Sequence, residues 1–179
     1  GKYEVERVLG SGGMGVVVSA KHVHLGERVA INVLLPQAIK KPEVVQRFLR
    51  EGRAAVRIKS EHVARVYDVG TLEDGAPYMV MEFLEGADLS TLLKTKGAVP
   101  VPLAVEYVLQ ACEAIAEAHS LKIIHRDLKP ANLFVAKRAD GSPVVKVIDF
   151  GIAKVAEAEG EVEMTKTDVM MGSPVYMAP

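Results

Sequence analysis

The eight residues from His125 to Asn132 are the part of this chain that most limits what it can be. They place an imidazole, two cations, a carboxylate and a carboxamide around a proline that stiffens the backbone. A carboxylate can orient an acceptor hydroxyl, a lysine two residues later can offset phosphate charge, and an asparagine five residues later can offer oxygen to a metal. The pattern favours a phosphoryl-transfer loop over the simpler interpretation, a polar turn after an amphipathic helix.

The composition excludes several other classes of protein. Hydrophobic residues make up 49% of the 179, which is enough to bury a sizeable core. With 22 basic and 23 acidic residues the net charge is −1, so nothing indicates a nucleic-acid or membrane-surface binder. We find no apolar run long enough to cross a bilayer and no signal peptide, and therefore expect a cytoplasmic protein whose chain contacts neither nucleic acid nor membrane.

Periodicity in the sequence predicts alternating groups of strands and helices. We expect strands over residues 3–9, 16–18, 27–35, 63–71, 77–83, 133–135 and 144–148. We expect helices over residues 42–58, 89–96 and about 102–120. The last of these has a wide apolar face that includes Val105, Val108 and Leu109, so we expect it to belong in a core. Cys112, the only cysteine, lies on that face and is predicted to be an inert buried thiol.

A glycine-rich segment, Gly10 to Gly15, joins the first two predicted strands. The β-branched residues Val16 to Val18 follow it at once, whereas a dinucleotide-binding fold needs a helix after its glycines. Glycines let backbone N–H groups approach phosphates without obstruction by Cβ. The segment is either a flexible hairpin tip or a cover for the phosphates of a nucleotide, and the polar loop at 125–132 favours the cover.

The residues around two carboxylates, Glu51 and Asp149, indicate what each could do. Glu51 lies on the apolar stripe of the helix 42–58, where it needs a cation or a hydrogen-bond donor. It either faces the candidate site or is solvated and held by Arg47 or Lys59. Asp149 ends an apolar strand 17 residues after Asn132, where it can act as a hard oxygen ligand for a hard cation.

Together these segments resemble the protein kinase family, in the style of the bacterial, eukaryotic-like Ser/Thr kinases. Residues 125–132 are similar to its catalytic loop, with the lysine of the Ser/Thr branch, and residues 149–151 are similar to its metal-binding triplet. Residues 81–86 resemble its hinge, and residues 172–179 resemble the substrate-docking end of its activation segment. The resemblance covers the whole chain and implies an α+β, two-lobed fold.

The resemblance also implies a division of the chain. Residues 1–81 would form the smaller lobe, with a five-stranded sheet, one regulatory helix and the glycine-rich loop. Residues 82–87 would form the hinge, and residues 88–179 part of the larger lobe. Because the sequence ends inside the family's Ala-Pro-Glu motif, we expect a fragment or truncated gene product, with the apolar face of the helix 102–120 exposed.

The implied reaction is transfer of the γ-phosphate of MgATP to a Ser or Thr hydroxyl of a protein substrate. Asp127 would take the hydroxyl proton and Lys129 would stabilise the moving phosphoryl group. Asn132 and Asp149 would hold Mg²⁺ between the phosphates.

The resemblance implies a wider set of nucleotide-binding residues, from both predicted lobes. They are Leu9, Gly10, Gly12, Gly15, Val17, Ala30, Asn32, Glu51, Met81, Glu82, Leu84, Asp88 and Phe134. Leu9 and Val17 would close over the adenine, the backbone from Glu82 to Leu84 would meet its edge, and Met81 would guard the pocket behind. Asp88 is either the ribose-binding acid or the N-cap of the helix 89–96.

The segment from Gly151 onward matches an activation segment. Thr165 and Thr167 lie where kinases of this type carry regulatory phosphates, which could pair with Arg126. The simpler interpretation is two threonines in a loop without a regulatory role. Ser173 belongs to the implied substrate-docking end, and autophosphorylation at the threonines would involve self-association.

Asn32 is where the sequence departs from the family. Residues 29–32 match the family's Val-Ala-Ile-Lys motif except at the lysine, which holds the α- and β-phosphates and pairs with a helix glutamate. Lys21, at the far end of the second strand, is a poor substitute. We therefore expect impaired activity. The alternative is a pseudokinase that binds a nucleotide or a partner, and a third interpretation is a single-base change, because lysine and asparagine codons differ only in the third position.

Overall fold

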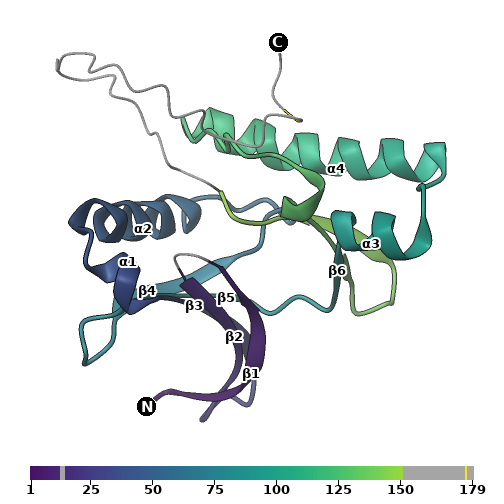
Figure 1. Cartoon of the computed structure of the whole chain (residues 1–179). Coiled ribbons are helices and arrows are strands. Elements are labelled where there is room, and N and C mark those ends of the chain that lie inside the picture. The colour runs from purple at the N-terminus through teal and green to yellow at the C-terminus, as the bar shows by residue number, and fades with distance from the viewer. Residues whose placement is uncertain (13–14, 151–175, 177–179) are drawn as a thin grey trace, which may run out of the picture. The chain divides into compact units, whose positions relative to one another are not determined.

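The structure of the chain is a computed structural model that describes residues 1–12, 15–150 and 176. It consists of two compact units, Gly1–Glu85 and Gly86–Pro179, and each is described by itself (Figure 1). The first unit combines a sheet with two helices, and the second combines a smaller sheet with two helices and a 3-10 turn. Among the residues described, no helix is both long and apolar enough to span a bilayer.

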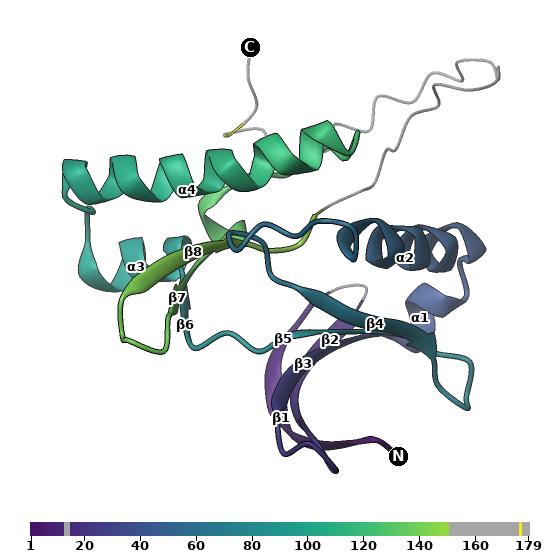
Figure 2. The same ribbon diagram turned by 180° about the vertical axis from the view of Figure 1, so that it is seen from behind.

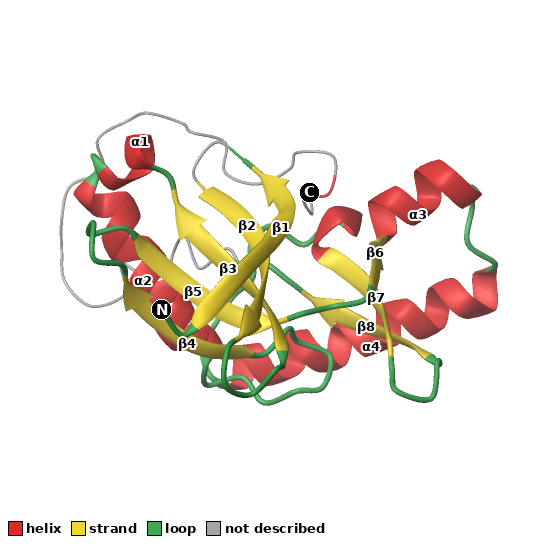
Figure 3. Cartoon of the chain, turned by 90° about the horizontal axis from the view of Figure 1, so that it is seen from below, coloured by secondary structure: helices red, strands yellow, loops and turns green. Residues whose placement is uncertain are grey.

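The first unit is built on a five-stranded antiparallel sheet, drawn in yellow in Figure 3. Its strands are β1 (Tyr3–Ser11), β2 (Gly15–His22), β3 (Arg28–Leu34), β4 (Val66–Thr71) and β5 (Pro77–Glu82). They are ordered β1-β2-β3-β5-β4, so β3 lies at the centre and β1 and β4 form the edges. Each of the five strands overlaps a stretch that the sequence predicts to be extended.

Helix α2 (Pro42–Ala55) covers one face of this sheet (Figure 1). It buries Val44, Phe48, Gly52 and Ala55, which recur at helical spacing, against β4 and β5. Gly52 permits the close approach, because a Cβ there would lie 2.6 Å from Val69 Cγ2 and 2.9 Å from Met79 Cε. A short helix, α1 (Pro36–Ile39), precedes α2 and contributes the buried Ala38 to the same core.

The alternation of side chains along β3 separates the two faces of the sheet. Val29 and Ile31 are buried in a cluster with Ala20 and Val80. Leu34 points to the opposite face, into the core under α2. Ala30 and Asn32 have the parity of Leu34 and therefore lie on the α2 side of the sheet.

The second unit contains a three-stranded antiparallel sheet that packs on helices (Figure 2). Its strands are β6 (Gly86–Asp88), β7 (Leu133–Lys137) and β8 (Pro143–Val147), in that order. Its helices are α3 (Leu89–Lys96), α4 (Val101–Ser120) and the 3-10 helix η1 (Pro130–Asn132). Helix α4 packs against β8, and Gln110 Oε1 accepts a hydrogen bond of 2.7 Å from the backbone N–H of Val145.

The structure corrects three predictions about helices and strands. Helix α2 ends at Ala55 rather than Ile58. Helix α1 was not predicted, because four residues are too few to show a helical period. Strand β6 was not predicted either, since its three residues extend only by pairing with β7, far along the chain.

Of the two expectations for the apolar face of α4, burial in a core is wrong and exposure is confirmed. The helix buries Tyr107 together with Ala111, Ala114 and Ala118, and the three small alanine side chains let it lie close to its neighbours. Among the described residues, the larger apolar side chains Val105, Val108 and Leu109 lie on an exposed face instead. Cys112 is exposed as well, so the prediction of a buried thiol is also wrong.

We predict that Gly86→Ala is far more destabilising than Gly75→Ala. Both glycines have positive φ, 147° and 87°. A Cβ at Gly86 would lie 2.1 Å from the carbonyl oxygen of Val135, a backbone atom of β7, whereas nothing lies within 4 Å of one at Gly75.

The free energy of unfolding, measured by urea titration of the full-length natural protein, should therefore fall by about 3 kcal/mol or more for Gly86→Ala. The fall for Gly75→Ala should be about 1 kcal/mol, from the positive φ alone. Equal losses would show that β6 does not pair with β7 in this register.

Candidate active site

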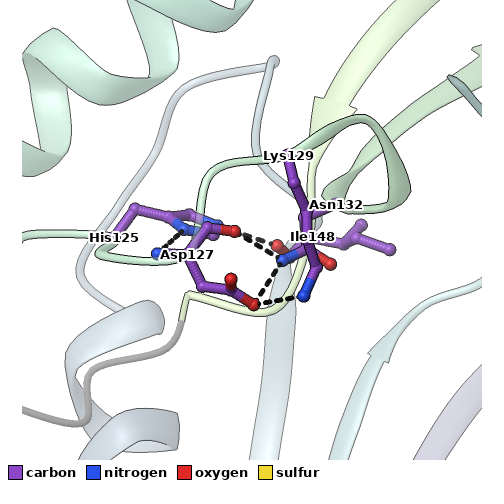
Figure 4. Close-up of polar contacts among 5 residues, drawn as sticks. All are labelled: His125, Asp127, Lys129, Asn132 and Ile148. Atoms are coloured by element: carbon purple, nitrogen blue, oxygen red, sulfur yellow. Dashed lines mark hydrogen bonds and ion pairs between the residues drawn. The ribbon is translucent and has the colours of Figure 1, made fainter. Parts of the chain in front are cut away.

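A compact set of polar side chains forms around Asp127 in the second unit (Figure 4). The Lys129 ammonium lies 2.6 Å from Asp127 Oδ2. Asn132 Nδ2 donates to the Asp127 backbone carbonyl at 2.8 Å and to Asp127 Oδ2 at 3.3 Å. Asp127 is therefore held by a cation and an amide, and such charge-assisted hydrogen bonds favour the ionised carboxylate.

The backbone around Pro130 brings these side chains together. Lys129 is extended, and Pro130 then starts η1, in which the N–H of Asn132 donates to the carbonyl of Lys129 at 2.8 Å. Asn132 is buried, and its own carbonyl accepts a hydrogen bond of 3.0 Å from the N–H of Ile148. The loop is thereby joined to the end of β8, immediately before Asp149.

His125 makes a second connection between the loop and β8 (Figure 4). Its Nε2 lies 3.0 Å from the carbonyl oxygen of Ile148, and its Nδ1 accepts a hydrogen bond of 3.3 Å from the N–H of Asp127. These partners require the neutral tautomer with the proton on Nε2. Burial lowers the pKa of His125, against the opposing effect of the Ile148 carbonyl and of nearby carboxylates, so the ring stays neutral.

Nothing in the residue pattern predicts this role for His125, although the residue lies in the segment 125–132 on which the sequence analysis rests. Its ring also packs on Phe150, with 4.8 Å between the ring centroids. Phe150 and His125 are both buried. One imidazole therefore positions Asp127 on one side and the start of the segment after β8 on the other.

Asp149 has an unusual environment for a carboxylate. Although part of its surface is open to solvent, the surrounding protein raises its pKa by desolvation. Asp127 raises the pKa of Asp149 further, while His125 and Lys129 act in the opposite direction. A cation beside Asp149 would offset the desolvation of the carboxylate and favour its ionised form.

Backbone strain occurs at two places in the same cluster. Arg126 has a φ of 63° and Asp149 a φ of 51°, both in the left-handed region that non-glycine residues seldom adopt. Each such residue costs on the order of 1–3 kcal/mol, and strain of this kind gathers at functional sites. One of the two strained residues precedes Asp127, and the other is the candidate metal ligand Asp149 itself.

Asn132 and Asp149 have the chemistry that Mg²⁺ prefers. The amide nitrogen of Asn132 is committed to Asp127, which leaves its Oδ1 as the atom available to a cation. The described residues contain no cluster of three or more His, Cys, Asp or Glu side chains that could hold a metal by themselves. This suits magnesium, which binds one or two protein oxygens together with substrate phosphates and water.

Asp88 is the N-cap of α3. Its Oδ1 accepts a hydrogen bond of 2.9 Å from the N–H of Thr91, and its Oδ2 one of 2.6 Å from the Thr91 hydroxyl. Burial alone would raise the pKa of Asp88, but the hydrogen bonds from Thr91 outweigh it and the pKa is lowered. In the sheet Asp88 pairs with Phe134, so two residues of the predicted nucleotide set are neighbours.

The glycine-rich hairpin of the first unit closes against Asn32. The N–H of Gly12 donates to the carbonyl of Gly15 at 2.9 Å, and Gly13 and Met14 between them lie outside the described residues. A Cβ on Gly15 would lie 2.9 Å from Asn32 Oδ1 and 3.0 Å from the Val33 carbonyl oxygen. The carboxamide of Asn32 therefore lies directly over Gly15.

Four residues of the predicted nucleotide set share one face of the first sheet. Val17 pairs with Asn32, and Ala30 pairs with Met81 on the next strand. The same face receives α2, on which Glu51 is half-buried. Of the remaining predicted residues in this unit, Leu9, Gly10 and Gly12 are exposed at the end of β1 and just beyond it.

The end of β5 is fixed by a reciprocal pair of hydrogen bonds. The N–H of Glu82 donates to the Arg65 carbonyl at 2.8 Å, and the N–H of Arg65 donates to Glu82 Oε2 at 3.2 Å. Leu84 follows, half-buried, just before the boundary of the unit after Glu85. The predicted Thr165, Thr167 and Ser173 lie outside the described residues.

The structure thus brings together one part of the predicted set within each unit. In the second unit Asp127, Lys129 and Asn132 are in direct contact, with Asp149 next to Ile148. In the first unit Val17, Ala30, Asn32 and Met81 share a face, with Gly15 against Asn32.

Comparison with known proteins shows what this arrangement is similar to. The family model described as "Protein kinase domain" matches residues 3–179. The serine/threonine-protein kinase Pkn1 of Myxococcus xanthus is 42% identical over 179 residues, which is 100% of this chain and 25% of that protein. The serine/threonine-protein kinase PknB of Mycobacterium leprae is 37% identical over 181 residues, covering 99% of this chain and 28% of that protein.

A solved structure gives the same result for the fold. The PknI kinase domain of Mycobacterium tuberculosis superposes with a TM-score of 0.72 at 30% identity, covering 86% of this chain and 61% of that one. The predicted α+β, protein-kinase-like fold is confirmed. The chain spans about a quarter of the length of the two curated relatives.

We predict that His125→Phe destabilises the protein although it preserves an aromatic ring against Phe150. The phenyl ring can neither donate to the Ile148 carbonyl nor accept from the Asp127 N–H, so buried polar groups lose their partner at a cost of about 1–3 kcal/mol.

Thermal unfolding of the full-length natural protein would measure this loss. The matched control is His119→Phe, at the exposed end of α4, which should change the free energy of unfolding by less than about 0.5 kcal/mol. An equally small effect of His125→Phe would mean that the imidazole does not hold the loop.

Proposed function

Because the chain belongs to the protein kinase family, we propose that it is a Ser/Thr kinase domain that transfers the γ-phosphate of MgATP to protein hydroxyls, with activity impaired by Asn32. The observation that supports this best is the contact of Asp127 with both Lys129 and Asn132, which gathers a candidate base, a cation and a candidate metal ligand in one loop. The printed names of the relatives support the Ser/Thr class.

Asp127 would accept the proton of the substrate hydroxyl. Its Oδ2 receives both the Lys129 ammonium and the Asn132 amide, so the carboxylate is ionised and oriented before a substrate arrives. Lys129, 2.6 Å away, would share its charge with the phosphoryl group as the group moves.

Asn132 and Asp149 would hold Mg²⁺, through Asn132 Oδ1 and the Asp149 carboxylate. When bound, the ion would neutralise phosphate charge and orient the nucleotide. The protein contributes the positions of the two ligands, because Ile148 is tied to Asn132 and to His125 directly before Asp149. The raised pKa of Asp149 is consistent with a site completed by a cation.

The asparagine at position 32 is expected to slow phosphoryl transfer, and it also favours the alternative function, that of a pseudokinase. An asparagine amide offers no positive charge to phosphates, and loss of one preorganised donor typically costs about 10²–10³ in rate. Its Oδ1 also lies against Gly15, at the base of the glycine-rich hairpin. A pseudokinase that binds a nucleotide or a partner without turnover is therefore the second candidate.

Partners and regulation follow from the same proposal. The substrate would be a protein with a Ser or Thr acceptor, docking through a segment that includes Ser173. Phosphorylation between two copies at Thr165 and Thr167 would regulate activity. Neither nucleic acid nor membrane is needed by this chain, and we place its reaction in the cytoplasm.

We predict that Asn32→Lys raises phosphoryl transfer by about 10²–10³-fold, because it restores a cation at the phosphates. The measurement is phosphate incorporation from MgATP into the full-length natural protein, located by peptide mass spectrometry. Phosphate should be found at Thr165 or Thr167 in the lysine form. Asp127→Asn, made in the lysine form, should abolish incorporation and shows that the phosphate does not come from a contaminant.

The outcomes separate the candidate functions. Equal activity of the asparagine and lysine forms would show that no lysine is needed at this position. Nucleotide binding without incorporation in either form would favour the pseudokinase over the kinase.

We also predict that Asp149→Asn removes the magnesium-dependent part of nucleotide affinity. Asparagine tolerates the left-handed φ of 51° at this position, so the backbone should be preserved while the charge is lost. Calorimetry of ADP binding, with Mg²⁺ or with EDTA, should show a large effect of Mg²⁺ on the natural protein and little on the variant.

The control for this experiment is Asp140→Asn, in the exposed turn between β7 and β8. Its response to Mg²⁺ should equal that of the natural protein. An unchanged response in Asp149→Asn would mean that Asp149 does not bind the ion.

A further inference from the structure

Four residues form a connected row across the first unit, and none belongs to the nucleotide set inferred above. Glu6 lies on β1 where the pairing register with β2 shifts, between Val5 and Arg7. The others are Ser19 on β2, Arg28 at the start of β3, and Phe83 directly after β5. They connect strands β1, β2 and β3 to the segment that follows β5.

Glu6 organises the polar half of this row. Its Oε2 accepts a hydrogen bond of 2.7 Å from the hydroxyl of Ser19 and lies 2.9 Å from Arg28 Nε, while its Oε1 accepts a bond of 3.4 Å from Arg28 Nη2. The guanidinium is thus held as a two-point fork, which fixes the direction of its plane. Ser19 is completely buried, so one end of the network is anchored inside the sheet.

The carboxylate of Glu6 stays ionised in this arrangement. The hydrogen bond from Ser19 lowers the pKa of Glu6, desolvation opposes it, and the bond from Arg28 lowers it further. The contacts that lower the pKa of Glu6 therefore include its ion pair with Arg28.

The fixed guanidinium lies over the ring of Phe83, with 5.2 Å between Arg28 Cζ and the ring centroid. This is cation–π distance. Phe83 stands between Glu82 and Leu84, so the contact reaches the segment whose backbone we assign to the adenine. Glu82 is separately bonded to Arg65, and the segment is therefore held from two directions.

Ser19 and Arg28 of this row lie on the face of the sheet that carries the predicted nucleotide residues. Ser19 pairs with Ala30, and Arg28 precedes Ala30 by two residues, so their side chains share the face of Val17 and Asn32. The network is therefore a neighbour of the predicted adenine residues of this unit.

We propose that Arg28 is a positioning residue for nucleotide binding, oriented by Glu6 and Ser19 and acting on the segment 82–84 through its contact with Phe83. The inference rests on the proposed function, since it assumes that this segment binds adenine. It extends that function by assigning nucleotide affinity to a side chain that does not touch the nucleotide.

A different experimental result is expected if this network has only a structural role. If the network only joins β1 to β3, its loss lowers stability and leaves the affinity for nucleotide unchanged. If it positions the segment 82–84, its loss weakens nucleotide binding and raises the KM for ATP, with kcat unchanged.

The first test is the Kd for MgADP in the full-length natural protein. Arg28→Ala should raise the Kd about three- to tenfold, from loss of one cation–π contact and the order it imposes. The matched control is Lys21→Ala, because Lys21 is the exposed register partner of Arg28 and its removal also deletes one cation. This control should leave the Kd unchanged. In the Asn32→Lys form, Arg28→Ala should raise the KM for ATP without changing kcat.

The second test needs no nucleotide. Amide hydrogen exchange over residues 80–85 should become faster in Arg28→Ala and in Phe83→Leu, but not in Lys21→Ala. The double variant should exchange no faster than either single variant, because both remove the same contact.

The outcomes distinguish this inference from the proposed function. A Kd for Arg28→Ala equal to that of Lys21→Ala, or unchanged exchange over residues 80–85, would overturn the positioning role alone. A natural protein that binds no nucleotide would overturn the proposed function and this role with it.

Discussion

The hydrogen bonds from the buried Asn132 amide to Asp127 are the interaction on which the proposed chemistry of the second unit depends. Its nitrogen reaches Asp127 at two oxygens, and its backbone carbonyl receives the N–H of Ile148. A buried polar group is costly unless every hydrogen bond is made, so this side chain has few alternative positions. The conformation of the loop and the end of β8 are therefore set together. His125 reinforces the connection, because its two ring nitrogens reach the same two segments.

The groups that would carry the reaction are held at an energetic cost. Asp149 and Arg126 adopt left-handed backbone conformations, and the pKa of Asp149 is raised by desolvation. Such costs persist only where the surrounding contacts determine the geometry. Here those contacts are the two hydrogen bonds of Ile148 and the packing of His125 on Phe150. A bound cation and phosphates would repay part of the electrostatic cost, which agrees with a site that binds charged ligands.

Asn32 fits the fold, although it lacks the charge that the proposed chemistry uses at this position. It lies in the central strand, paired on both sides with Val17 and Met79, and backbone pairing is indifferent to the charge of the side chain. Its carboxamide is placed against Gly15, where a Cβ would not fit. The sheet is therefore complete with asparagine at this position. If the proposed function holds, the missing lysine would weaken phosphate binding and activity rather than stability.

Features that depend on residues close together in the chain could be predicted before the fold was known. The loop 125–132, the glycine-rich hairpin, the five strands of the first sheet and the choice of caps for α3 all follow from local spacing and residue type. Tertiary packing, by contrast, selected the buried face of α4, where Tyr107 and three alanines pack closely while the more hydrophobic face stays exposed. It also decided the pairing of β6, the role of His125 and the row from Glu6 to Phe83. Each of these joins residues far apart in the chain, and periodicity reports only which side chains share a face, not what that face will meet.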